Sequence, residues 1–167
     1  LADYNCDGRE DIFNWTQGGS GSGMSIYRND FDSILGLQFT LVSGSSEAWS
    51  PAISTETSSG LVNLYISIYD RPAITDIDGD GDLDVLTFCL NCTMVEFHRN
   101  YGREDYGTCD SMRFVLEDIC WGNFSENAQG EITLGACKTG QSGSVGTEPT
   151  HPGGSSMLAL DMDGDND

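Results

Sequence analysis

The chain has 167 residues, a formal net charge of −20 and six cysteines. Aspartate and glutamate outnumber lysine and arginine by 27 to 7, and a charge of this sign and size opposes binding to nucleic acid and to anionic membrane surfaces. No stretch approaches the roughly 20 consecutive apolar residues of a membrane-spanning helix, so membrane insertion is not expected.

The expected elements, taken in chain order, are almost all short strands that alternate apolar and polar residues. In the first part of the chain the expected strands are 11–16, 24–29, 37–42 and, after a serine-rich insertion at 43–60, 61–68. In the second part they are 72–75, 84–88, 94–100 and 113–117, followed by a Gly/Ser/Thr-rich segment at 138–156 and an apolar segment at 157–160. No segment shows a sustained helical period, so we expect an all-β protein.

Two acidic segments, 3–11 and 76–84, share the pattern D-x-[DN]-x-D-G-x-x-D, and a third, 161–167, begins it with Asn166 in place of the glycine; together they hold 13 of the 27 acidic residues. Oxygen-bearing side chains at positions 1, 3, 5 and 9 would surround one point, and position 6 holds a residue that tolerates a left-handed backbone. Such a loop suits a hard divalent cation with six to eight oxygen ligands, usually calcium. Without an ion, the clustered carboxylates would repel one another.

We expect calcium ligands from these side-chain oxygens and from the main-chain carbonyl at position 7. The predicted ligands are Asp3, Asn5, Asp7, Asp11 and the carbonyl of Arg9 in the first loop, Asp76, Asp78, Asp80, Asp84 and the carbonyl of Asp82 in the second, and Asp161, Asp163, Asp165 and the carbonyl of Asp167 in the third. The sequence thus predicts two complete calcium sites and a third whose loop stops before positions 8 and 9. An EF-hand is disfavoured because it needs a bidentate glutamate at position 12, where this chain has Asn14 or Thr87, and because strands rather than helices flank the loops.

The loops also mark an internal repeat, since they begin 73 and then 85 residues apart. Units of this length with about four strands each predict β-propeller blades that carry loop insertions. The predicted organisation is a first blade at 1–70, a second blade at 71–156 and the start of a third at 157–167.

The segment PAITDIDGDGDLDVL at 72–86, followed by VEFHRN at 95–100, resembles an FG-GAP/VCBS repeat. This repeat is the blade of integrin-alpha-type β-propellers and is common in large secreted and surface-attached bacterial proteins. The resemblance covers both complete units and implies that calcium lies between the first and second strands of each blade. The units are longer than the usual blade of that family. Because a closed propeller needs about four to eight blades, we expect the chain to belong to a longer polypeptide or to pack against other chains.

The six cysteines suit an oxidising, extracellular compartment, and they allow 15 full pairings among which the sequence cannot choose. Cys89-x-x-Cys92 is compatible with a redox pair, with a zinc site shared with Cys109 and Cys120, and with structural disulfides. Structural disulfides fit best, with one bridge across the turn at Cys89 and Cys92 and one that joins Cys109 to Cys120 or Cys137. Asn14, Asn91 and Asn123 each begin an N-glycosylation acceptor triplet.

No nucleophile motif is present, and the paired carboxylates are better explained as ion ligands than as catalysts, so no enzymatic activity is expected. The predicted function is a calcium-binding structural or adhesive repeat of an extracellular or cell-surface protein. Its expected partners are calcium and either neighbouring blades or other chains of an assembly. The alternatives are a propeller that recognises a glycan or a protein, with Trp15, Trp49 and Trp121 as candidate stacking surfaces, and an accessory domain of a larger secreted enzyme.

Overall fold

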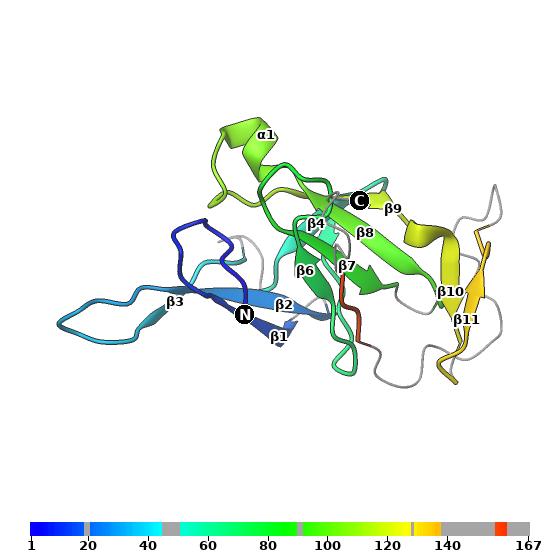
Figure 1. Ribbon diagram of the computed structural model, residues 1–167, viewed down its shortest axis with the longest axis horizontal. Coiled ribbons are helices and arrows are strands. Elements are labelled where there is room, and N and C mark those ends of the chain that lie inside the picture. Colours follow the sequence, from blue (N-terminus) through cyan, green and yellow to red (C-terminus); the bar gives the residue numbers. More distant parts are fainter. Residues whose placement is uncertain (19–20, 45–50, 90–91, 128, 138–155, 160–167) are drawn as a thin grey trace.

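The computed structural model describes residues 1–18, 21–44, 51–89, 92–127, 129–137 and 156–159, and these are almost entirely strands and turns (Figure 1). The strands are β1 (Ile12–Gly18), β2 (Gly21–Asn29), β3 (Phe39–Leu41), β4 (Ser54–Thr57), β5 (Gly60–Asn63), β6 (Ala73–Thr75), β7 (Asp84–Phe88), β8 (Val95–Asn100), β9 (Phe114–Asp118), β10 (Phe124–Glu126) and β11 (Ile132–Leu134). One short helix, α1 (Gly102–Tyr106), and one 3-10 turn, η1 (Trp121–Asn123), complete the described elements. The expectation of an all-β protein is confirmed for this part of the chain.

The strands form three sheets. β1, β2 and β3 make an antiparallel sheet, to which an isolated bridge between Ala2 and Asp11 adds the start of the chain. A six-stranded sheet has the order β5-β4-β9-β8-β7-β6, and β10 pairs with β11 alone. Within the large sheet β6, β7, β8 and β9 run antiparallel in chain order. Each acidic loop therefore precedes the second of four successive antiparallel segments.

The hairpin β4–β5 comes from the segment expected to complete the first blade, yet it joins the sheet of the second unit. β4 pairs with β9 in parallel, with Thr55 opposite Phe114. The hydroxyl of Thr55 lies 3.0 Å from Nδ1 of the buried His98 on β8. Arg113 donates to both carboxylate oxygens of Glu56, at 3.0 and 2.9 Å. The boundary predicted after residue 70 therefore does not separate two sheets.

The central β6–β9 sheet has a hydrophobic core on each face, because successive strand residues point in opposite directions. On one face Val85 and Phe114 pack against Met24 and Ile26 of β2, in the core formed by Tyr4, Met24, Ile26, Ile53, Leu64, Ile66, Val85 and Phe114. On the other face lies the core of Ala73, Leu86, Phe88 and Val95. Trp121, Phe124 and Met157 pack against this second core. The first sheet thus covers only one face of the central sheet.

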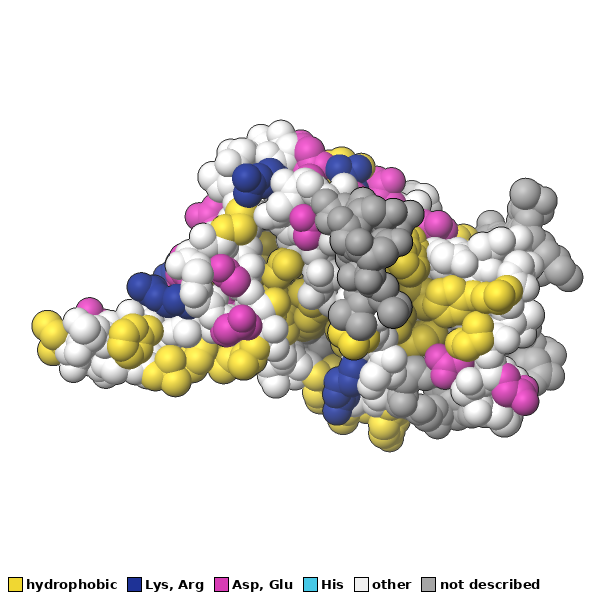
Figure 2. Space-filling model, in the orientation of Figure 1, with side chains coloured by type: hydrophobic (Ala, Val, Ile, Leu, Met, Phe, Trp, Pro, Cys, Tyr) yellow, Lys and Arg dark blue, Asp and Glu magenta, His cyan; other side chains and the backbone are white. Residues whose placement is uncertain are grey.

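The hairpin between β2 and β3 projects from the body of the molecule, at the left of Figure 1. Its tip and sides carry exposed hydrophobic side chains, including Ile34, Leu35 and Leu37, which Figure 2 shows as yellow along the arm. Exposed apolar surface that is gathered in one place is typical of interaction sites. Among the described residues no helix is long and apolar enough to cross a membrane.

The cysteines form three disulfides, Cys6–Cys109, Cys89–Cys92 and Cys120–Cys137. The bridge expected across the turn at Cys89 and Cys92 is confirmed. The expected bridge from Cys109 to Cys120 or Cys137 is wrong, because Cys109 pairs with Cys6, 103 residues away. The packing of the first loop beside the segment after α1 brings these two together. No cysteine is left free for a zinc site.

Candidate metal centre

The loops at 3–11 and 76–84 share most of their hydrogen bonds, 73 residues apart, but Oδ1 of the first aspartate accepts the amide of Asp7 in one loop and that of Gly79 in the other. At position 1, Asp3 Oδ2 accepts from the amide of Gly8 at 2.8 Å and Asp76 Oδ2 accepts from the amide of Gly81 at 3.0 Å. Both glycines have a left-handed backbone, with φ values of 82° and 93°. The position-1 carboxylate therefore closes each loop at the residue where the chain must turn back.

The middle positions repeat as well. At position 5, Asp7 Oδ1 accepts from the amide of Arg9 and Asp80 Oδ1 accepts from that of Asp82, both at 2.9 Å. At position 3, Asn5 Oδ1 accepts from the amide of Asp7 at 3.4 Å. Asp78 Oδ1 does the same for the amide of Asp80 at 3.3 Å. At positions 3 and 5 of both loops, one side-chain oxygen accepts a backbone amide two residues further along the chain. The other polar atom of each side chain takes no part in that bond.

The position-9 aspartates, Asp11 and Asp84, have a role that the motif does not reveal. Both are 0% exposed; Asp84 is the first residue of β7, and Asp11 directly precedes β1. Asp84 accepts the amide of Ile77 at Oδ2, 2.9 Å, and the amide of Asn100 at Oδ1, 2.8 Å. Asp11 accepts the amides of Tyr4 at 3.0 Å and Asn29 at 2.8 Å in the same way. Each carboxylate thus fastens the loop to the next strand, β8 or β2, in addition to facing the loop.

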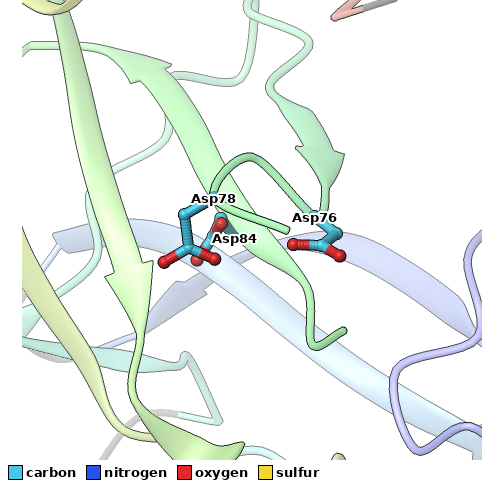
Figure 3. A group of neighbouring side chains, drawn as sticks. All are labelled: Asp76, Asp78 and Asp84. Atoms are coloured by element: carbon cyan, nitrogen blue, oxygen red, sulfur yellow. The ribbon is translucent and has the colours of Figure 1, made fainter. Parts of the chain in front are cut away.

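The second loop gathers oxygens as a metal site requires. One carboxylate oxygen from each of Asp76, Asp78 and Asp84 lies within 4.8 Å of the other two, and Figure 3 shows Asp78 and Asp84 directed toward each other with Asp76 at the opposite side. Oδ2 of Asp80 and Oδ1 of Asp82 are buried without a hydrogen-bond partner among the described residues. Clustered anionic oxygens with unused lone pairs are the donors that hard divalent cations prefer. The residues present at this loop therefore fit a metal ion.

In the first loop, Asp3, Asp7 and Asp11 do not form a comparably close group. Its third position is Asn5, whose amide oxygen is a neutral ligand. The two loops share their backbone framework and differ in how closely their carboxylates approach.

Burial disfavours the ionised form of two carboxylates in the second loop. Desolvation raises the pKa of Asp84 to about 7, against the amide hydrogen bonds from Asn100 and Ile77 that lower it. Desolvation likewise raises the pKa of Asp82 to about 6, and the neighbouring Asp80 and Glu104 add to that rise. A bound cation inverts this situation, because it stabilises the ionised carboxylates around it.

Arg99 is the residue at this site that sequence reasoning missed. Its Nε lies 2.5 Å from Asp78 Oδ2, its Nη2 lies 3.7 Å from Asp80 Oδ2, and it also pairs with Glu104 of α1. Asp78, Asp80 and Glu104 themselves form a close group of carboxylates, and the guanidinium of Arg99 accounts for that group. The available signal was the alignment of the two repeats, which places Arg28 at the equivalent position, next to Asn29 as Arg99 is next to Asn100.

The two arginines act differently. Arg28 pairs with Asp30, 2.6 Å away, and not with a carboxylate of the first loop. The first loop carries the neutral Asn5 where the second carries Asp78. The additional negative charge of the second loop is therefore offset by a positive side chain of the same chain.

The remaining predicted site residues fall in two groups. Arg9 and Asp82 occupy position 7, and the buried side chain of Asp82 accepts the amide of Arg103 at 2.9 Å through Oδ2. Asp161, Asp163, Asp165 and Asp167 of the third loop lie outside the described residues, as do Trp49 and Asn91.

Comparisons with protein-family models, with curated proteins and with solved structures find no match. The fold and the loops define a disulfide-linked all-β protein with paired acidic loops, and its acidic clusters could hold a metal ion.

Proposed function

We propose that this chain is a calcium-binding repeat of an extracellular or cell-surface protein, with a structural or adhesive role. The observation that carries the proposal is the shared hydrogen-bond framework of the loops at 3–11 and 76–84. Each loop stands before the second of four antiparallel segments, and in the second loop Asp76, Asp78 and Asp84 bring their carboxylates close together. Such oxygen-only loops of irregular geometry suit calcium better than magnesium, which demands a small and rigid octahedral shell.

We further propose that the two units are blades of a β-propeller. The succession β6, β7, β8, β9 is the four-stranded meander expected of a blade, and the bridge at Ala2 with β1, β2 and β3 is its counterpart in the first unit. Packing of the first sheet on one face of the central sheet agrees with neighbouring blades in contact. The exposed apolar residues of the β2–β3 arm supply surface for other blades or chains.

Calcium would add positive charge among the clustered carboxylates, and it would connect loop positions that are otherwise joined by hydrogen bonds to backbone amides and, in the second loop, by Arg99. An ion that binds only the folded state stabilises it by about 2.7 kcal/mol per site at a hundredfold excess over its Kd. For an extracellular location the support is three disulfides, the net charge of −20 and the exposed Asn14 of an N-glycosylation triplet.

Thermal unfolding in calcium and in excess chelator tests the proposal. Chelation should lower Tm by several degrees, calcium should restore it, and magnesium at the same concentration should restore little. Asp80→Ala provides the control, because a variant that lacks a ligand should respond less to calcium. Coincident unfolding curves of the wild-type chain in calcium and in chelator would contradict the proposal.

Recognition of a glycan or a protein is a second candidate, favoured by one observation. An open cavity of about 630 Å³ borders the second loop and is lined by Phe88, Trp121 and Phe124, with Asp76 at its edge. Its size is that of a small-molecule site, and aromatic rings commonly stack on sugars. Titration of calcium-loaded protein with oligosaccharides, followed by tryptophan fluorescence, would test this reading, with Trp121→Ala as the control.

A further inference from the structure

The two acidic loops are in contact through a disulfide. Cys6 is position 4 of the first loop, and it is bonded to Cys109 in the segment that follows α1. The sulfur atoms of Cys6 and Cys109 lie 3.6 and 3.5 Å from the carbonyl oxygen of Gly81, which is position 6 of the second loop. The bridge therefore joins the first loop to a segment that lies against the second loop.

Cys6 has a backbone that side-chain-bearing residues rarely adopt. Its φ is 58°, and the only other described non-glycine residue with positive φ is Asn123. The equivalent position in the second loop is Gly79, with φ of 80°. Both loops thus need a left-handed residue at position 4, and only the second loop supplies the residue type that adopts it without strain.

The other end of the bridge is firmly held. Cys109 is buried, and its sulfur accepts a hydrogen bond from Arg103 Nη1 at 2.9 Å. The backbone amide of Arg103 in turn donates to Asp82 Oδ2 of the second loop at 2.9 Å. Cys6, by contrast, is exposed. The disulfide consequently fastens a strained and exposed residue of the first loop to an anchor built on the second.

We propose that the Cys6–Cys109 disulfide positions the first loop for its metal ion by holding Cys6 in the left-handed conformation. This inference rests on the proposed function. If the bond is opened by a dithiol, which becomes a disulfide as the two cysteines become thiols, Cys6 is free to leave that conformation. Its neighbours Asn5 and Asp7, both expected ligands, then move, and the bond from the Asp7 amide to Asp3 Oδ1 at 3.1 Å is lost. The second loop keeps its shape because Gly79 needs no such support.

The amides of Gly8 and Gly81 report the two sites separately, because each is bonded to the first aspartate of its own loop. Calcium chloride is titrated into isotope-labelled chain, and the shifts of these two amides are followed by NMR. The wild type is compared with Cys6→Ser/Cys109→Ser and with Cys6→Gly/Cys109→Ser. Both variants lack the disulfide, and they differ only in whether position 4 accepts a left-handed backbone.

In the serine variant the calcium midpoint at Gly8 should rise about tenfold or more, while that at Gly81 changes less than about threefold. In the glycine variant the midpoint at Gly8 should return to within about threefold of the wild type. Cys6→Asn/Cys109→Ser should lie between them, because asparagine tolerates the left-handed region, and it replaces the serine variant if that variant does not fold.

Equal Gly8 midpoints in the wild type and the serine or asparagine variant would overturn the inference, as would equal weakening with glycine and with either of the other two residues. The absence of any calcium-dependent shift at Gly81 in the wild type would instead contradict the proposed function itself. The two failures are therefore distinguishable.

Discussion

The carboxylate of Asp84 accepts a hydrogen bond from the backbone amide of Asn100, 2.8 Å away across the hairpin from β7 to β8. Asp11 and Asn29 repeat this relationship at the same distance in the first unit. Asp84, a predicted metal ligand of the loop, therefore also connects β7 to β8. Loss of this side chain should damage the fold even when no metal is present.

Asp84→Ala leaves the buried amide of Asn100 and the part-buried amide of Ile77 without their acceptor. Because each unsatisfied buried amide costs about 1–3 kcal/mol, we expect the free energy of unfolding in excess chelator to fall by at least about 2 kcal/mol. Asp11→Ala should behave alike. Denaturant unfolding measures the change. Asp80→Ala is the control, because it removes no hydrogen bond to a backbone amide of a neighbouring strand and only a 3.7 Å ion pair with Arg99 of β8. An Asp84→Ala loss no larger than that of Asp80→Ala would refute the fastening role.

Asp80→Ala should instead act on metal stoichiometry. It removes a predicted ligand of the second loop, whose remaining carboxylates still repel one another. The number of calcium ions bound, measured by calorimetry, should fall by one while the first loop remains occupied. Asp7→Ala is the matched variant and should remove the first-loop ion alone. If the stoichiometry is unchanged in both variants, these loops are not the binding sites.

Arg99→Gln should strengthen calcium binding at the second loop. The guanidinium of Arg99 lies 2.5 Å from Asp78, so its positive charge repels a calcium ion bound at the second loop. Because the substitution removes this unit charge, we expect calcium binding to tighten about tenfold. The metal-free protein should at the same time become less stable. Arg28→Gln is the internal control, since Arg28 pairs with Asp30 and should leave the affinity of the first loop unchanged. Weaker calcium binding in Arg99→Gln would show that the arginine supports the site.

Gly102→Ala should be strongly destabilising because of a steric conflict at the start of α1. A Cβ at Gly102 would lie 1.9 Å from the carbonyl oxygen of Ser111, so one of two backbone segments must move. We expect a loss of at least about 2 kcal/mol in the free energy of unfolding. Tyr106→Ala, an exposed position of the same helix, should change it by less than about 0.5 kcal/mol. Comparable unfolding midpoints of the two variants would contradict this packing.

Local patterns determined much of what the sequence could predict. The acidic loops, their left-handed position 6 and the strands on either side follow from residues within about ten positions of one another, and β1, β2, β7, β8 and β9 lie close to their expected ranges. The strand β4 was missed because it lies in a serine-rich segment, where side chains give no apolar alternation. Its strand structure comes from pairing with β9, which is distant in the chain.

The tertiary structure alone decided which distant groups meet. Alternation of apolar residues predicts that a segment is a strand, but it carries no information on the neighbour that the strand will pair with. For the same reason Cys109 was expected beside Cys120 or Cys137 and lies instead against Cys6. The place of Arg99 among Asp78, Asp80 and Glu104 likewise depends on how α1 folds back over the second loop. The sequence by itself determined the chemistry of each loop, whereas the path of the chain between the loops determined what holds them together.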